Sequence, residues 1–187
     1  MAKIVSLPLA IIMSIISLFF PGNTDMPDKE QWTTNYPYVF VHGLSGWGSY
    51  DDTYKLMPYW GMFGGDLMEY LGDKGFTTAA ASVDPNGSAW DRACELYAQL
   101  AGTVVDYGKA HSEAHNHDRY GFDYTGKAIR GEPWDLNEKI NLVGHSFGGA
   151  TIRLFTSLLV YGDAEEIAAT GDETSALFTG GHDCIHS

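Results

Sequence analysis

The sequence has few basic residues for its length. Lysine and arginine number 11 against 24 aspartates and glutamates, so the formal net charge is −13. Nucleic acids and anionic membrane surfaces are bound mainly by clustered Lys and Arg, which this charge balance does not supply. We therefore expect no nucleic-acid partner, and contact with a membrane only through the hydrophobic N-terminal segment described below.

Cysteine is also scarce, and repeats and low-complexity segments are missing. The two cysteines, Cys94 and Cys184, lie in no metal-binding spacing and can pair only in an exported protein. Cys94 falls on the apolar face of a predicted helix, which favours a free buried thiol. The 187 residues are 44% hydrophobic and include 22 glycines, which is typical of one folded domain.

One long apolar run stands at the N-terminus. Lys3 precedes an uncharged stretch from Ile4 to Phe20, whose length lies between that of a signal-peptide core and that of a spanning helix. We interpret residues 1–22 as a signal peptide or an N-terminal membrane anchor. The protein is therefore expected to be secreted, or anchored at the membrane if this segment is not cleaved.

Strand and helix patterns alternate after residue 34. The predicted strands are 36–41, 76–83 and 139–143. Helix 66–71, ended by Gly72 and Gly75, lies between the first two strands, and helix 150–161 follows the third. A further helix after the second strand is capped by Ser88 and Asp91 and carries on one face Cys94, Tyr97, Leu100 and Val104. Apolar periodicity disappears between residues 106 and 132, which predicts a loop-rich excursion. The alternation predicts an α/β fold with a mostly parallel sheet and helices on both faces.

Residues 144–148, Gly-His-Ser-Phe-Gly, match the G-x-S-x-G pattern of a nucleophile elbow. The motif lies between a predicted strand and a predicted helix, which is the context in which this pattern carries chemistry. Ser146 would then stand on a strained turn, and Gly144 and Gly148 would let the neighbouring chain pass without clashes. We predict that Ser146 is a catalytic nucleophile.

Two backbone N–H groups are candidates for an oxyanion hole. The Phe147 N–H follows the nucleophile at the start of a helix, where the helix dipole adds partial positive charge. The second donor is expected in the loop after an early strand. The glycine-rich loop 42–48 occupies that place, and the Leu44 N–H is our candidate.

Four blocks, residues 36–48, 90–100, 103–117 and 144–161, carry a resemblance to a known family. The second contains Trp-Asp-Arg-Ala-Cys and the third Asp-Tyr-Gly-x-x-His. They resemble the large zinc-containing lipases of Gram-positive bacteria, the staphylococcal and thermoalkalophilic bacillus group. The resemblance implies an α/β-hydrolase fold and hydrolysis of triacylglycerols and shorter acyl esters. Phe147 stands where thermoalkalophilic members carry glutamine and Leu44 where an aromatic is common, so acyl-chain preference stays open.

The resemblance also implies a structural zinc site. Asp91, His111 and His117 match family positions that hold zinc together with a second aspartate, and that fourth ligand is expected outside this sequence. The zinc-binding excursion would span about residues 88–132. The family also admits Ca²⁺, with ligands outside this sequence. Residue type alone leaves two alternatives open. Asp91 can be only a helix cap with the histidines solvated at the surface, or residues 115–118 can hold a catalytic metal.

The sequence places little chain after the proposed nucleophile. In α/β-hydrolases the triad acid and histidine follow the serine on later strands. Asp163 or Asp172 followed by His182 match this chain order. The residues after the nucleophile helix are too few, however, to form the two further strands that would carry an acid and a histidine. We therefore interpret residues 23–187 as the N-terminal part of a hydrolase domain, truncated after the nucleophile helix and without its triad acid and histidine.

The leading hypothesis is a serine lipase or carboxylesterase that acts on lipid or acyl-ester substrates, with a lipid–water interface as a candidate place of action. The alternative is a catalytically inactive α/β-hydrolase-like surface binding module. The oligomeric state stays open.

Overall fold

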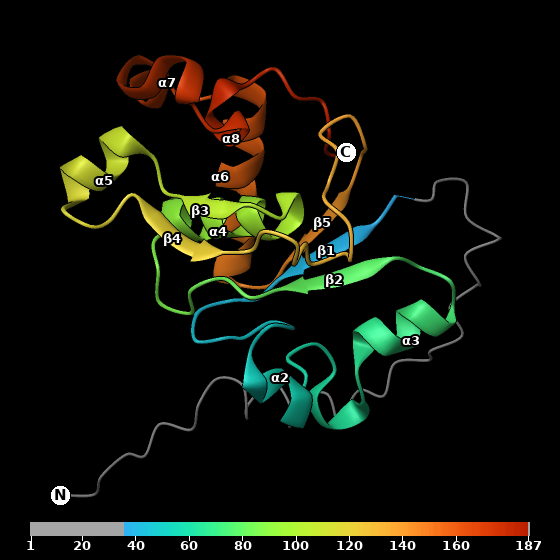
Figure 1. Cartoon of the computed structure of the whole chain (residues 1–187). Helices are drawn as coiled ribbons and strands as arrows, with labels where there is room; N and C mark the ends of the chain where they lie inside the picture. The colour runs from blue at the N-terminus through green and yellow to red at the C-terminus, as the bar shows by residue number, and fades with distance from the viewer. Residues whose placement is uncertain (1–35, 187) are drawn as a thin grey trace, which may run out of the picture.

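The computed structural model describes residues 36–186 and contains a parallel sheet covered by helices (Figure 1). The predicted segment 1–22 lies outside the described residues. The strands are β1 (Tyr38–Val41), β2 (Thr78–Ala81), β3 (Val104–Asp106), β4 (Tyr120–Asp123) and β5 (Asn141–Gly144). The helices are α2 (Asp52–Leu56), η2 (Met62–Gly64), α3 (Leu67–Asp73), α4 (Ala89–Ala101), α5 (Lys109–His115), α6 (Phe147–Tyr161), α7 (Ala164–Thr170), η3 (Gly171–Glu173) and α8 (Ala176–Thr179).

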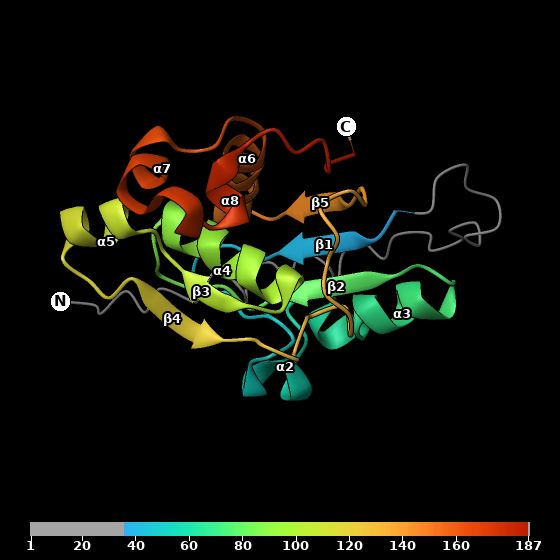
Figure 2. The ribbon, with the colours of Figure 1, turned by 45° about the horizontal axis from the view of Figure 1, so that its top comes forward.

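The main sheet has the order β2-β1-β5, and all three strands are parallel. Side chains of β1 alternate between two cores, as a pleated strand requires. Val39 and Val41 enter the larger core with α4 and α6, whereas Phe40 enters a smaller core with Leu71 and Phe76. Helices therefore cover both faces of the sheet, with α4 and α6 on one side and α3 on the other (Figure 2). The predicted parallel α/β arrangement is confirmed.

The excursion between α4 and β5 is more ordered than its sequence predicts. It contains α5 and the antiparallel pair β3 and β4. The Arg119 guanidinium donates two hydrogen bonds of 2.8 Å to the Asp106 carboxylate, which closes the segment between the two strands. All four residues of β4 are exposed. Because β4 buries no side chain and β3 buries only Val105, the ribbon shows too little apolar alternation to be predicted from the sequence.

Several predicted boundaries are wrong by a few residues. α3 runs through Gly72 and ends before Gly75, whose φ is +87°. Val104 lies in β3 and is 40% exposed, because α4 ends at Ala101. α6 begins at Phe147, earlier than expected, and α2, α7 and α8 were not predicted from the sequence.

The strand β5 is half-buried along its whole length. One side pairs with β1, whereas the other side meets, among residues 36–186, a single parallel bridge between Ile140 and Ile185. Both cysteines are free and buried, and burial raises the pKa of the Cys94 thiol well above its usual range. Among the described residues, no helix is long and apolar enough to cross a bilayer.

Candidate functional site

Ser146 stands on a sharp turn between β5 and α6. Its φ of 54° and ψ of −122° lie in a region that non-glycine residues rarely adopt. Such a conformation costs on the order of 1–3 kcal/mol and persists only where the surrounding structure imposes it. The residue is exposed, so its hydroxyl is available to a substrate at the carboxyl end of the sheet.

Two glycines make this turn possible. A Cβ added to Gly148 would lie 2.1 Å from the Val41 carbonyl oxygen, and one added to Gly144 would lie 2.7 Å from the backbone of Gly148. Both contacts are with backbone, which cannot rotate away as a side chain can. The start of α6 therefore packs directly on the end of β1, and this contact holds Ser146 in its strained conformation.

The loop after β1 lies beside the same turn. A Cβ on Gly43 would lie 2.9 Å from the Ser146 Cβ, so the two segments are in contact. The Gly43 carbonyl oxygen accepts from the Gly46 N–H at 3.1 Å and lies 2.8 Å from His42 Nδ1, which fixes the peptide that carries the Leu44 N–H. No hydrogen bond within residues 36–186 engages the Leu44 N–H or the Phe147 N–H. Both donors are therefore available next to Ser146.

Tyr59, a residue outside every predicted motif, joins this loop to the elbow. Its hydroxyl accepts from the Gly43 N–H at 3.2 Å and lies 2.6 Å from His145 Nδ1. Burial raises the pKa of Tyr59, so the phenol keeps its proton. The only sequence signal is an aromatic pair, Tyr59 and Trp60, in a segment without periodicity.

Arg92 is fully buried and connects three parts of the site. From α4 it donates to the His42 carbonyl, to the Thr151 hydroxyl at 2.9 Å and to the Asp84 carbonyl at 2.6 Å. These bonds tie the loop after β1 to α6. Arg92 belongs to the Trp-Asp-Arg block that carries part of the family resemblance. The block does not indicate that Arg92 connects the loop after β1 to α6.

Within residues 36–186, no hydrogen bond joins the Ser146 hydroxyl to a histidine. The His182 N–H donates to the Leu159 carbonyl near the end of α6, whereas Ser146 precedes the start of that helix. At 1.5 Å per residue the two positions are about 20 Å apart. Asp163 instead caps α7, and Asp172 lies in η3. The structure therefore does not bring these three residues to Ser146.

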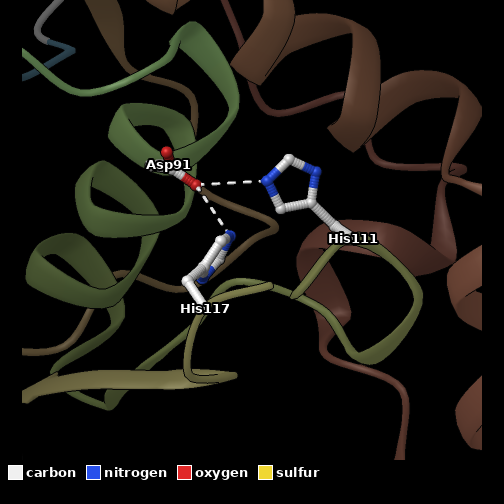
Figure 3. A group of neighbouring side chains, drawn as sticks. All are labelled: Asp91, His111 and His117. Atoms are coloured by element: carbon white, nitrogen blue, oxygen red, sulfur yellow. Dashed lines mark hydrogen bonds and ion pairs between the residues drawn. The ribbon is translucent and has the colours of Figure 1, made fainter. Parts of the chain in front are cut away.

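Asp91, His111 and His117 converge on one point (Figure 3). Their ligand atoms all lie within 4.8 Å of one another. Asp91 Oδ1 lies 3.3 Å from His111 Nε2 and 3.9 Å from His117 Nε2. Ligands of tetrahedral zinc at about 2.0–2.2 Å stand about 3.3–3.6 Å apart, so the geometry and the donor set fit this ion. The cluster was predicted, and the structure brings its three members together.

The neighbours of the cluster orient its ligands. Ser88 caps α4 by accepting from the Asp91 N–H, and its hydroxyl donates to Asp91 Oδ2, which leaves Oδ1 facing the histidines. His117 Nδ1 lies 2.9 Å from the Asp118 carbonyl oxygen, which leaves Nε2 for a metal. Asp91 can thus cap a helix and act as a ligand at the same time.

Burial lowers the pKa of His111, which keeps its ring in the neutral, ligating form. The ring is stacked on Trp90, with the centroids 4.8 Å apart. His115 touches the His111 ring, with centroids 4.4 Å apart, but it is not one of the three converging residues. The geometry therefore favours His111 and His117 over His115 as ligands.

Comparisons with known proteins match most of the chain. A family model described as "Lipase-like, C-terminal domain" covers residues 34–187. Lipase 2 of Staphylococcus aureus is 47% identical over 159 residues, which are 83% of this chain and 22% of that protein. A lipase of Staphylococcus epidermidis is 39% identical over 168 residues, 86% of this chain and 24% of that protein. The chain thus spans less than a quarter of the length of these curated relatives.

Solved structures share the fold over a similar part. EstA from Clostridium botulinum matches with a TM-score of 0.73 and 42% identity, over 87% of this chain and 38% of that chain. Staphylococcus hyicus lipase matches with a TM-score of 0.73 and 38% identity, over 87% of this chain and 42% of that chain. Sequence and fold agree, and the chain belongs to the staphylococcal lipase family, matching its lipase-like C-terminal domain.

Proposed function

We propose that the chain carries the nucleophile part of a serine lipase or carboxylesterase site that hydrolyses triacylglycerols or shorter acyl esters. The observation that carries this proposal is Ser146, exposed on a strained turn between β5 and α6 and bordered by two unpaired backbone N–H groups. The similarity to staphylococcal lipases supports the same chemistry. In this proposal the sheet is part of an α/β-hydrolase fold.

The chemistry follows from the groups around Ser146. Its hydroxyl attacks the ester carbonyl, and the resulting oxyanion accepts hydrogen bonds from the Leu44 and Phe147 N–H groups. A histidine general base takes the serine proton and later passes it to the leaving alcohol, after which water releases the acyl group. No histidine among residues 36–186 meets the serine hydroxyl, so this base and its acid would lie outside the described part.

Asp91, His111 and His117 would hold a structural zinc ion. Bound there, the metal would join α4 to the excursion and so stabilise the fold, with a fourth ligand from outside the described residues. A family-type Ca²⁺ site would likewise have its ligands elsewhere. We further propose that the protein is secreted and acts on lipid substrates at a lipid–water interface.

A catalytically inactive surface module is the second candidate, because the Ser146 hydroxyl has no histidine partner within residues 36–186. A fluorophosphonate ester separates the two candidates, since it modifies only an activated serine. The experiment uses the longest natural chain that contains residues 34–187, with Ser146→Ala as its control. Labelling that disappears in the control is expected. No labelling of a folded wild-type protein would favour the binding module.

A further inference from the structure

Glu166 is a buried carboxylate that the proposed function does not use. It lies on α7 and is 1% exposed. Its side chain reaches the first turn of α5, which lies beside α7 (Figure 2). Oε1 accepts from the His111 N–H at 2.7 Å, and Oε2 accepts from the Ala110 N–H at 3.1 Å.

Gly108, the residue before α5, lies directly against the Glu166 carboxylate. A Cβ on Gly108 would lie 2.4 Å from the Glu166 carboxyl carbon and from Oε1, and the φ of Gly108 is +90°. The Gly108 N–H is in turn held by the Asp106 carboxylate at 3.0 Å. The chain entering α5 is therefore fixed between Asp106 on one side and Glu166 on the other.

One of the two bonded N–H groups belongs to His111 itself. The backbone of a metal-site histidine is thus anchored by a side chain from another helix, more than 50 positions later in the sequence. Metal sites require ligands held within about 0.5 Å of their productive geometry by residues outside the coordination shell. Loss of the anchor would let the first turn of α5, and with it the His111 ring, move away from Asp91.

We propose that Glu166 is a positioning residue for the metal site, which it serves by fixing the His111 backbone from α7 and not by acting as a ligand. The inference rests on the proposed metal site. It makes metal affinity depend on the docking of α7 against α5, two helices whose contact the sequence motifs do not reveal.

The test uses the longest natural chain that contains residues 34–187 and measures Zn²⁺ affinity by competition with a chromogenic chelator, together with the visible spectrum of the Co²⁺ form. Glu166→Gln keeps the size of the side chain but points an amide N–H at a backbone N–H. We expect Zn²⁺ affinity to fall about 10- to 100-fold, as for other residues that support metal ligands, and the Co²⁺ bands to shift. The matched control is Glu165→Gln, an exposed neighbour on the same helix, which should change neither.

A purely structural role would lower the melting temperature of the metal-free protein but leave affinity and spectrum unchanged at temperatures where the variant is folded. That result overturns the proposal. If Glu166→Gln does not fold, Glu166→Asp decides by the same criterion, because it keeps the charge but draws the carboxylate away from the two bonded N–H groups. Failure of the metal site itself looks different, since the wild-type chain would then bind no Zn²⁺ and His111→Ala would change nothing.

Discussion

The turn at Ser146 and the metal-type cluster at Asp91 are built in opposite ways. The turn comes from five consecutive residues, and its strain is imposed by backbone contacts of Gly144 and Gly148. The cluster comes from two segments about 20 residues apart, and its geometry depends on side chains such as Asp106 and Glu166 that hold the excursion. The geometry of a contiguous motif is set by its own residues and their immediate backbone contacts. The geometry of a site built from separate segments depends on other residues that hold those segments in place.

The first prediction tests the chemistry assigned to the turn. In the longest natural chain containing residues 34–187, Ser146→Ala should lower turnover of a short-chain nitrophenyl ester by roughly 10⁶-fold, because nothing else supplies the nucleophile. The melting temperature should stay close to that of the wild type, since the hydroxyl is exposed. Turnover at the wild-type rate would contradict the serine mechanism.

The second prediction tests the cluster by removing the metal. Purified protein should contain about one zinc per chain, and at free zinc 100 times above Kd the ion should add about 2.7 kcal/mol to the free energy of unfolding. His111→Ala and His117→Ala should abolish that gain, while His115→Ala should keep it. Thermal unfolding with and without a chelator measures the effect. Equal losses in all three variants would mean that the ligands are assigned wrongly.

The third prediction sharpens the claim that backbone contacts impose the strain. Gly148→Ala should lower the free energy of unfolding by about 1–3 kcal/mol, because the added methyl meets the Val41 carbonyl. Gly149→Ala is the matched control, since a Cβ there meets nothing within 4 Å. It should stabilise α6 by about 0.5–1 kcal/mol. Urea unfolding of both variants gives the comparison, and equal destabilisation would refute the steric argument.

The fourth prediction concerns Glu95, which lies one helical turn after Asp91. Burial raises its pKa from 4.5 to about 7. Between these pH values the folded chain holds a proton that the unfolded chain has lost, so stability falls as pH rises from about 4.5 to 7, by at most about 1.4 kcal/mol per pH unit. The loss levels off about one pH unit above 7.

Glu95→Gln should flatten this dependence and be more stable than the wild type at pH 8. Denaturant unfolding in the presence of a chelator measures both profiles, and the exposed Glu132→Gln serves as control. A wild-type stability that rises over this pH range, once corrected for the control, would show that Glu95 is not held protonated.

The sequence located the strand, turn and helix around Ser146 because each step is local. A buried strand, a turn with small residues and an amphipathic helix leave their marks within a few neighbouring positions. It failed in the excursion, where β4 is exposed on both faces and the Asp106–Arg119 pair that closes the segment between β3 and β4 joins residues 13 positions apart. It also missed Tyr59, whose two partners lie 16 and 86 positions away.

By itself, the sequence determined the alternation of strands and helices and the position of the serine turn, because these follow from side-chain type, periodicity and short spacings. The three metal-ligand residues came from the family resemblance, which matches positions along the chain and says nothing of their distances. Only the tertiary structure decided that Asp91, His111 and His117 meet, that Glu166 anchors α5, and that His182 lies far from Ser146. Those outcomes depend on how helices pack across a sheet, and packing joins residues whose separation along the chain carries no local signal.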